Sequence, residues 1–154
     1  MPPESAASLE RVRSASGEEL KSLVHEAGEE VLLALLENPH VEETHVTLLL
    51  ERLDLPASVL SGVAREGKWT SSEAVRLRLA RHPRTPKRIA LAAARQLYLF
   101  DLVRLSLSPS APADIRRLAE EVILTRAPHL PAGEKLTLAR RGPPRVPGPP
   151  LAEG

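Results

Sequence analysis

Pairs of prolines, the second three residues after the first, recur between leucine-rich segments of this 154-residue chain. The residue before a proline is pushed out of the helical region of backbone space, so the first proline of a pair ends a helix. The second proline suits the start of the next helix, where no backbone N–H is needed. The sequence therefore predicts short helices joined by tight corners at Pro83-Arg84-Thr85-Pro86, Pro109-Ser110-Ala111-Pro112 and Pro128-His129-Leu130-Pro131.

These corners lie at matching places in an internal repeat. Placing Pro83 on Pro109, an offset of 26 residues, also places Pro86 on Pro112 and aligns the leucine-rich segments before them. Placing Pro39 on Pro83 aligns an earlier leucine-rich segment in the same way, although the second proline is absent there. Self-similarity of this kind predicts a stack of helical units in which each unit packs on its neighbours.

The best-defined unit reads Leu77-Arg78-Leu79-Ala80-Arg81-His82-Pro83-Arg84-Thr85-Pro86. It resembles the repeat of the bacterial leucine-rich repeat variant proteins, which are relatives of HEAT-type α-solenoids. The resemblance covers roughly residues 30–140 and implies an all-α fold, a right-handed α-solenoid of short paired helices. Such proteins serve mainly as scaffolds, so the resemblance implies binding rather than a reaction. Some family members hold an iron–sulfur cluster through cysteines, and this chain has no cysteine, so no cofactor is expected.

Composition divides the chain into three parts. Residues 1–16 are small, polar and proline-bearing, which predicts a disordered, flexible N-terminal arm. Residues 17–141 contain the helical repeat domain, whose last unit begins at Pro131. Residues 142–154 are rich in proline and glycine, which predicts a disordered C-terminal tail.

Two capping-box patterns mark further helix starts. In this pattern a Ser or Thr precedes a Glu by three residues, and each side chain bonds a free backbone N–H of the first turn. The pattern predicts that helices begin at Ser16–Glu19 and at Thr70–Glu73.

The composition also limits the class of protein. Hydrophobic residues make up 42% of the chain and are almost all Leu, Ala and Val, which suits closely packed small helices. The absence of cysteine excludes disulfides, thiolate metal sites and a cysteine nucleophile. The longest apolar runs, such as Val31 to Leu36, are too short to span a bilayer, and the first residues lack a signal-peptide pattern. We therefore expect a cytoplasmic protein without a membrane segment.

Charge is distributed unevenly along the chain. Residues 1–54 carry a net charge of −8, whereas residues 65–95 carry +7. Basic side chains at the end of one predicted helix, in the corner after it and at the start of the next helix are expected to gather along one edge of the stack. They are Arg78, Arg81, Arg84, Lys87 and Arg88.

These five residues form the candidate partner-binding site. Guanidinium groups bind carboxylates well, so an acidic protein surface is the expected partner. A second hypothesis is nucleic-acid binding by a HEAT-like domain through the basic segment 65–95, because phosphates would also suit it. The alternative without a binding role is a solvated face that the acidic N-terminal helices partly neutralise.

Aromatic residues bear on the nucleic-acid hypothesis. HEAT-like DNA glycosylases act on a damaged base through aromatic and acidic side chains, and Trp69, Tyr98, Phe100 and Asp101 are similar in kind. However, Tyr98 and Phe100 fall in an apolar stretch, which predicts that both belong to the core. The five basic residues also have no aromatic side chain between them, whereas bases normally stack on exposed aromatics interleaved with basic residues.

The sequence contains no pattern typical of catalysis. A Gly-x-Ser-x-Gly elbow, a phosphate-binding glycine loop and a dinucleotide fingerprint are all absent. His40 and His45 are five residues apart and point about 140° away from each other on a helix, which does not fit a zinc pair. His25, His82 and His129 are isolated and expected at the surface or in corners. We expect a non-enzymatic protein without catalytic or metal-binding residues.

Overall fold

The computed structural model describes residues 6–129, which form ten α-helices and contain no strand. The predicted all-α fold is therefore confirmed for this part of the chain. A short 3-10 turn, Ala127–His129, follows the last helix. In chain order the helices are α1 (Ala6–Ser14), α2 (Gly17–Glu26), α3 (Glu29–Leu35), α4 (Glu43–Leu49), α5 (Ala57–Ala64), α6 (Gly67–Thr70), α7 (Glu73–Arg81), α8 (Lys87–Arg95), α9 (Leu99–Ser106) and α10 (Ala113–Arg126).

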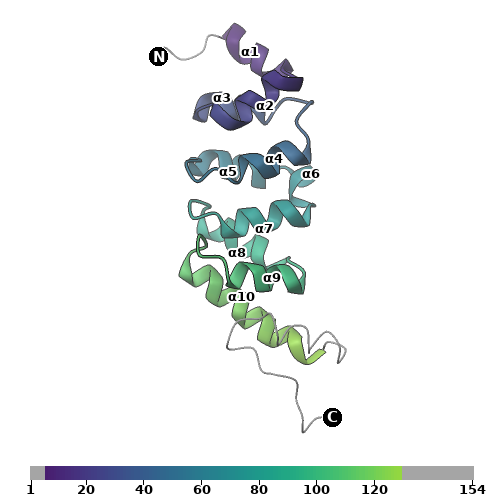
Figure 1. Ribbon diagram of the computed structural model, residues 1–154, viewed down its shortest axis with the longest axis vertical. Coiled ribbons are helices and arrows are strands. Elements are labelled where there is room, and N and C mark those ends of the chain that lie inside the picture. Colours follow the sequence, from purple (N-terminus) through teal and green to yellow (C-terminus); the bar gives the residue numbers. More distant parts are fainter. Residues whose placement is uncertain (1–5, 130–154) are drawn as a thin grey trace.

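The helices follow one another along the long axis of the molecule in two layers (Figure 1). Layer A consists of α2, α4, α7 and α9, each of which packs on the previous helix of the layer. Layer B consists of α1, α3, α5, α8 and α10, with contacts from α1 to α3, α3 to α5 and α8 to α10. Contacts of α2 with α3, α7 with α8 and α9 with α10 join the layers. The short helix α6 lies between α5 and α7 and packs on both.

The core lies between the two layers and is built mainly from short aliphatic side chains. Leu20, Leu60, Leu79, Leu102 and Ile115 each expose 1% of their surface or less. Small side chains let neighbouring helices approach closely, as the Leu-, Ala- and Val-rich composition predicts.

The N-terminal residues differ from the arm that the sequence predicts for residues 1–16. Residues 6–14 form α1, which packs on α3 and buries Val12 to 8% exposure. A helix of nine residues is too short to be stable alone, so its structure depends on this contact with α3. The predicted unit from Pro131 and the predicted tail lie outside the described residues.

The predicted corners at Pro83–Pro86 and Pro109–Pro112 are present, with the helices beginning one residue later than expected. Pro86 and Pro112 are the N-cap residues directly before α8 and α10, and Pro56 has the same place before α5. Ser72, rather than Thr70, caps α7 through a bond from the Val75 N–H to its hydroxyl. Thr70 instead ends α6, a single helical turn that the sequence pattern does not separate from α7.

Two buried side chains fasten corners to the helix ends behind them. The Asn38 amide donates to the carbonyl oxygens of Val12 and Ala15, both at 2.8 Å, and its oxygen accepts from the His40 N–H at 2.7 Å. His82 follows α7 as Asn38 follows α3, and both residues are at most 2% exposed. These bonds give partners to carbonyl groups that a helix end leaves free.

His82 makes the equivalent bonds with an imidazole ring. Its Nδ1 accepts from the Arg84 N–H at 3.1 Å, so Nε2 carries the proton and donates to the Arg52 carbonyl at 2.7 Å. Asn38 and His82 therefore form equivalent hydrogen bonds, one through an amide group and the other through an imidazole ring. Each accepts from the backbone N–H two residues later, and each donates to the preceding helix of its layer or to the corner that follows that helix.

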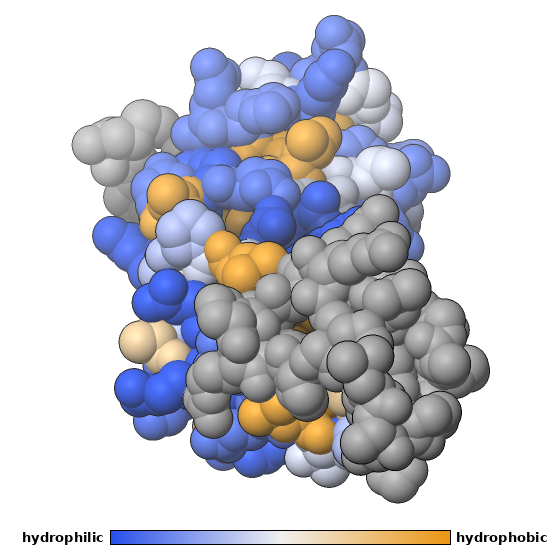
Figure 2. Space-filling model, turned by 60° about the horizontal axis from the view of Figure 1, so that its bottom comes forward, coloured by the Kyte–Doolittle hydropathy of each residue, from blue (hydrophilic) through white to orange (hydrophobic). Residues whose placement is uncertain are grey.

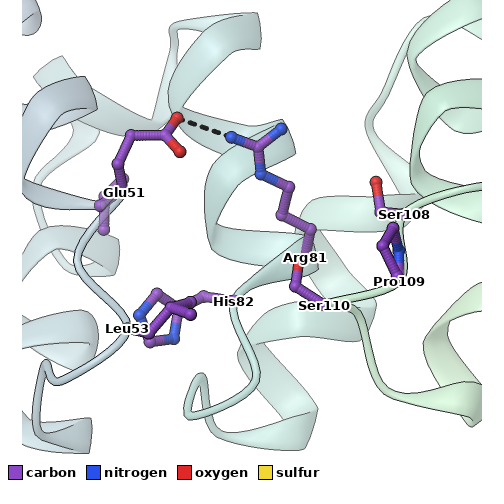
Figure 3. A pocket seen from close by; sticks show the side chains of 8 residues that line it. Glu51, Leu53, Arg81, His82, Ser108, Pro109 and Ser110 are labelled. Atoms are coloured by element: carbon purple, nitrogen blue, oxygen red, sulfur yellow. Dashed lines mark hydrogen bonds and ion pairs between the residues drawn. The ribbon is translucent and has the colours of Figure 1, made fainter.

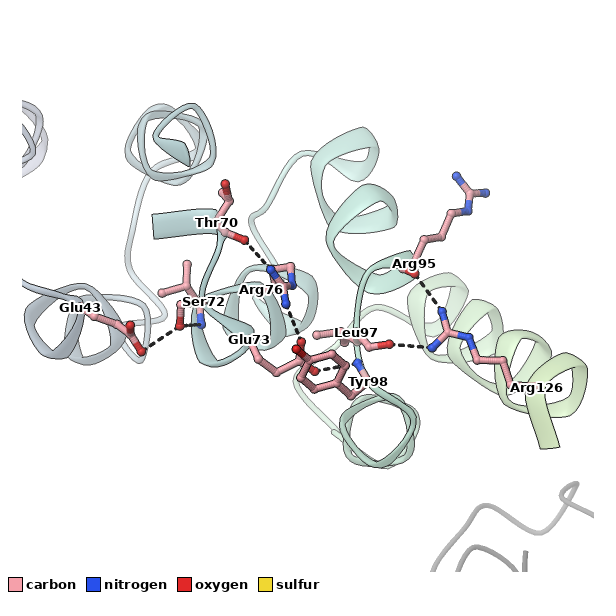
Figure 4. A network of polar contacts seen from close by, with 10 residues as sticks. Glu43, Thr70, Ser72, Glu73, Arg76, Arg95, Leu97, Tyr98 and Arg126 are labelled. Carbon is pink, nitrogen blue, oxygen red and sulfur yellow. Dashed lines mark hydrogen bonds and ion pairs between the residues drawn. The ribbon is translucent and has the colours of Figure 1, made fainter. Parts of the chain in front are cut away.

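Arginine side chains form further hydrogen bonds of this kind. We call these bonds, together with those of Asn38 and His82, corner ties. Arg52, after α4, donates to the Val24 carbonyl in the last turn of α2 at 3.0 Å. Arg126, at the end of α10, donates to the Leu97 and Arg95 carbonyls at 2.7 and 3.0 Å (Figure 4). Corner ties thus run within each layer, from one helix end to the previous one.

We expect His82→Ala to destabilise the protein by about 1–3 kcal/mol, because the Arg84 N–H and the Arg52 carbonyl lose their buried partners. His82→Asn should lose much less, since Asn38 makes the same bonds in the same place. Urea unfolding measures both differences. Equal losses in the two variants would mean that the ring's packing, and not its hydrogen bonds, matters at this corner.

The same corner predicts a loss of stability in acid. Burial is the main cause that lowers the pKa of His82 from its ordinary value of 6.5. The folded protein therefore resists a proton that the unfolded chain accepts, so the contribution of His82 is complete above pH 6.5 and falls as the pH drops below it. His82→Asn should reduce the loss of thermal stability between pH 7.5 and pH 5.5, and the exposed control His25→Asn should not. An unchanged loss in His82→Asn would contradict this expectation.

Candidate functional site

The five predicted binding residues lie around the corner between α7 and α8. Arg78 and Arg81 are in the last turn of α7, Arg84 is in the corner, and Lys87 and Arg88 open α8. We call this set the basic edge. The structure therefore brings the five residues to one end of the α7–α8 pair, as the sequence predicts, while their binding role remains a prediction.

Three of these cations are engaged in ion pairs. One oxygen of Glu51, after α4, lies 2.8 Å from Arg78 Nε and 2.6 Å from Arg81 Nη2. Lys87 Nζ lies 2.9 Å from an Asp114 oxygen in the first turn of α10. Because two guanidinium groups share one carboxylate, the Glu51 cluster keeps a net charge of +1.

Arg84 and Arg88 are exposed, and neither forms an ion pair within the described residues. The charge of Arg84 acts on Asp54, whose pKa is lowered mainly by its hydrogen bonds from Arg52 and slightly by Arg84. Arg52 already binds both Asp54 oxygens at 3.0 Å. The acidic N-terminal part of the chain thus leaves the basic edge with an excess of positive charge.

A groove of about 320 Å³ opens beside the basic edge (Figure 3). It crosses the C-terminal ends of α4, α7 and α9, three successive helices of layer A. Arg81 reaches across it to Glu51, and the buried ring of His82 lies at its base. The lining residues are Leu50, Glu51, Leu53, Arg81, His82, Ser108, Pro109 and Ser110.

Only Arg81 of the sequence-predicted residues lines this groove. The sequence pattern misses Leu53 because a leucine at helical spacing is expected in the core, whereas Leu53 is 60% exposed. Ser108 and Pro109 are missed because they come from another corner. The internal repeat holds the signal that would find them, since it places Pro83 on Pro109 and corners of a stack lie side by side.

The opposite end of the helices in layer A carries a network of first-turn carboxylates (Figure 4). The Ser72 hydroxyl donates to Glu43 at 2.8 Å, which ties the start of α7 to the start of α4. Glu73 accepts from the Tyr98 N–H at 2.8 Å and from Arg76 at 2.9 Å, which ties α7 to α9. Glu43 and Glu73 thus form hydrogen bonds to other parts of the protein.

Glu73 and Asp101 form a pair of interacting carboxyl groups in this network. Burial and then the neighbouring Glu73 raise the pKa of Asp101. Burial also acts to raise the pKa of Glu73, but hydrogen bonds from Asp101, the Tyr98 N–H and Arg76 outweigh it and lower that pKa. Of the two carboxyl groups, Asp101 is therefore the one that takes up a proton at the higher pH. The groove is lined by neither residue, so the pair serves to join α7 and α9.

The prediction that both aromatics of the α9 start belong to the core is wrong. Tyr98 is 68% and Phe100 39% exposed, because only Leu99 and Leu102 of this apolar run face the core, three residues apart on the helix. Trp69, in contrast, is 4% exposed, with the Lys68 ammonium 4.8 Å from the centre of its ring.

The described residues contain no group of three His, Asp or Glu side chains placed to hold a metal ion. His45 has a structural role, since its Nδ1 accepts from the Glu42 N–H at 2.9 Å at the start of α4. No described helix is both long and apolar enough to cross a membrane. Comparisons with protein-family models, with curated proteins and with solved structures find no match.

Replacing Asp101 by Asn tests the carboxyl pair. The stability that protonated Asp101 gives is complete below its ordinary pKa of 3.8 and is lost as the pH rises through its raised pKa. An amide cannot ionise, so Asp101→Asn should raise the melting temperature at pH 7.5 by about 2–4 °C and by less at pH 4.

Glu73→Gln is the matched control, and it should lower the melting temperature because it weakens the bond to Arg76. A lower melting temperature of Asp101→Asn at pH 7.5 would contradict the expectation. It would mean that the preference of a helix start for negative charge outweighs the repulsion from Glu73.

Proposed function

We propose that the chain is a right-handed HEAT-like α-solenoid, similar to the leucine-rich repeat variant proteins, that serves as a non-enzymatic protein-interaction scaffold. Its basic edge binds an acidic surface of a partner protein. The observation that carries this proposal is that Arg84 and Arg88 are exposed and form no ion pair with any residue of the described part, 6–129, beside a groove that crosses three helix ends.

The solenoid part of the proposal is supported by the contacts within layers. Each helix of layer A packs on the previous one, and corner ties repeat along the stack at Asn38, Arg52, His82 and Arg126. Nearest-neighbour packing of repeated helix pairs is the defining property of α-solenoids.

The surface supports recognition of a polar partner. On the face seen in Figure 2, hydrophobic residues form small areas separated by hydrophilic ones. Large obligate interfaces are instead broad and apolar. Charge attraction at a basic surface fits an acidic partner that binds and leaves.

The distribution of aromatic residues favours a protein partner over nucleic acid. Tyr98 and Phe100 are exposed, but Tyr98 is bonded to Glu73 at the start of α7, whereas Arg81 is at its end. A nine-residue helix places these ends about 12 Å apart. Bases stack on aromatics set among basic residues, whereas these two are set among carboxylates.

A double variant, Arg84→Glu with Arg88→Glu, tests the basic edge against fluorescein-labelled polyglutamate. We expect about tenfold weaker binding, since two unpaired cations become anions, with an unchanged melting temperature because both side chains are exposed. The matched control is Arg65→Glu with Arg95→Glu, two exposed arginines at the C-terminal ends of α5 and α8 and not in the α7–α8 corner, which should weaken binding less than threefold.

Equal weakening by the two double variants would remove the proposal. So would tighter binding of a 20-base-pair DNA duplex than of polyglutamate with a linear fall of log affinity against log salt, which would favour the nucleic-acid hypothesis.

A further inference from the structure

The groove beside the basic edge has the dimensions of a short extended chain. Its walls come from the ends of α4, α7 and α9, which are consecutive in layer A. Packed helices lie about 8–10 Å apart, so three helix ends span about 16–20 Å. An extended peptide rises about 3.3 Å per residue, so five or six residues cross the three ends.

The groove has an accessible apolar residue on each side (Figure 3). Leu53, after α4, is 60% exposed although it is a large aliphatic side chain, and the exposed Pro109 lies on the other side, after the end of α9. Leu50 lies beneath them and is 3% exposed. An apolar side chain of a bound peptide would remove this surface from water.

The polar side of the groove has hydrogen-bond donors that are not used within the described residues. Arg81 binds Glu51 through Nη2, while its Nε and Nη1 have no hydrogen-bond partner among the described residues. Arg84 is linked to the groove through its backbone N–H, which bonds the His82 ring.

Four guanidinium groups at the groove and its rim face two carboxylates, which leaves a local charge of about +2. The cations are Arg52, Arg78, Arg81 and Arg84, and the acids are Glu51 and Asp54.

We propose that this groove binds an extended acidic peptide segment of a partner protein, five to six residues long. A carboxylate of the peptide binds Arg81 and Arg84, one apolar side chain of the peptide packs on Leu53, and another packs on Pro109 at the other side of the groove. The inference rests on the proposed scaffold function and assigns it a site and a ligand class.

The test uses the full chain and a fluorescein-labelled eight-residue peptide in which Glu and Leu alternate, with binding followed by fluorescence anisotropy. Leu53→Ser should weaken binding about tenfold. Leu48→Ser is the matched control, since Leu48 is 43% exposed on the same α4 end region but does not line the groove, and it should change binding less than twofold. Both variants change exposed side chains, so their melting temperatures should match that of the wild type.

Two altered peptides separate this inference from the proposed function. Replacing every Leu of the peptide by Ser, or every Glu by Gln, should each abolish binding. If the Leu-free peptide binds as well as the first, and Leu53→Ser has no effect while the Arg84→Glu, Arg88→Glu variant does, the groove is not the site but the basic edge still binds acids. If the Glu-free peptide binds equally well, both proposals fail.

Nuclear magnetic resonance on the unaltered protein gives an independent readout. Addition of the Glu–Leu peptide should shift the amide signals of Leu53, His82 and Ser110 and leave those of the α9 start unchanged. Shifts confined to the Tyr98 end, or displacement of the peptide by a DNA duplex at equal charge concentration, would overturn the inference.

Discussion

The structure depends on the free carbonyl groups at the ends of its short helices. A helix of seven to ten residues leaves its last four carbonyl oxygens without partners inside the helix, which is a large fraction of its backbone. In this protein a side chain that follows or ends the next helix of the same layer reaches back to such carbonyl groups, as Asn38, Arg52 and Arg126 do, and His82 reaches back to a carbonyl in the corner after α4. Helices too short to persist alone therefore complete one another's hydrogen bonding.

The two ends of the layers have different chemistry for the same reason. At the starts of the helices in layer A, first-turn carboxylates such as Glu43 and Glu73 accept hydrogen bonds from the start of the following helix of the layer. At the other ends, Arg78 and Arg81 lie in the last turn of α7, where the helix dipole favours cations, and they share the single carboxylate of Glu51. The exposed Arg84 and Arg88 follow in the corner and in the first turn of α8, so positive charge collects at this side of the stack.

The sequence predicts the coarse fold well because prolines and leucine spacing act locally. The corners at Pro86 and Pro112 follow from backbone restrictions that no tertiary contact can override. Residues 6–14 are missed because a short, polar helix owes its stability to α3 and not to its own pattern. Tyr98 and Phe100 are missed because an apolar run does not say which of its members face inward. The five basic residues are brought together by their closeness in sequence, whereas the groove joins three separate corners and needs the stack to exist.

Layer A holds its helices together in a chain of adjacent contacts, with α7 packed between α4 and α9. Bending about α7 changes the separation of Leu53 and Pro109 on the two sides of the groove, because these residues belong to the outer two corners. Any molecule that fits across all three corners acts as a brace between α4 and α9. Its length then sets the curvature of the whole stack. Conversely, a change of curvature at one end changes the affinity of this groove for the molecule that it binds.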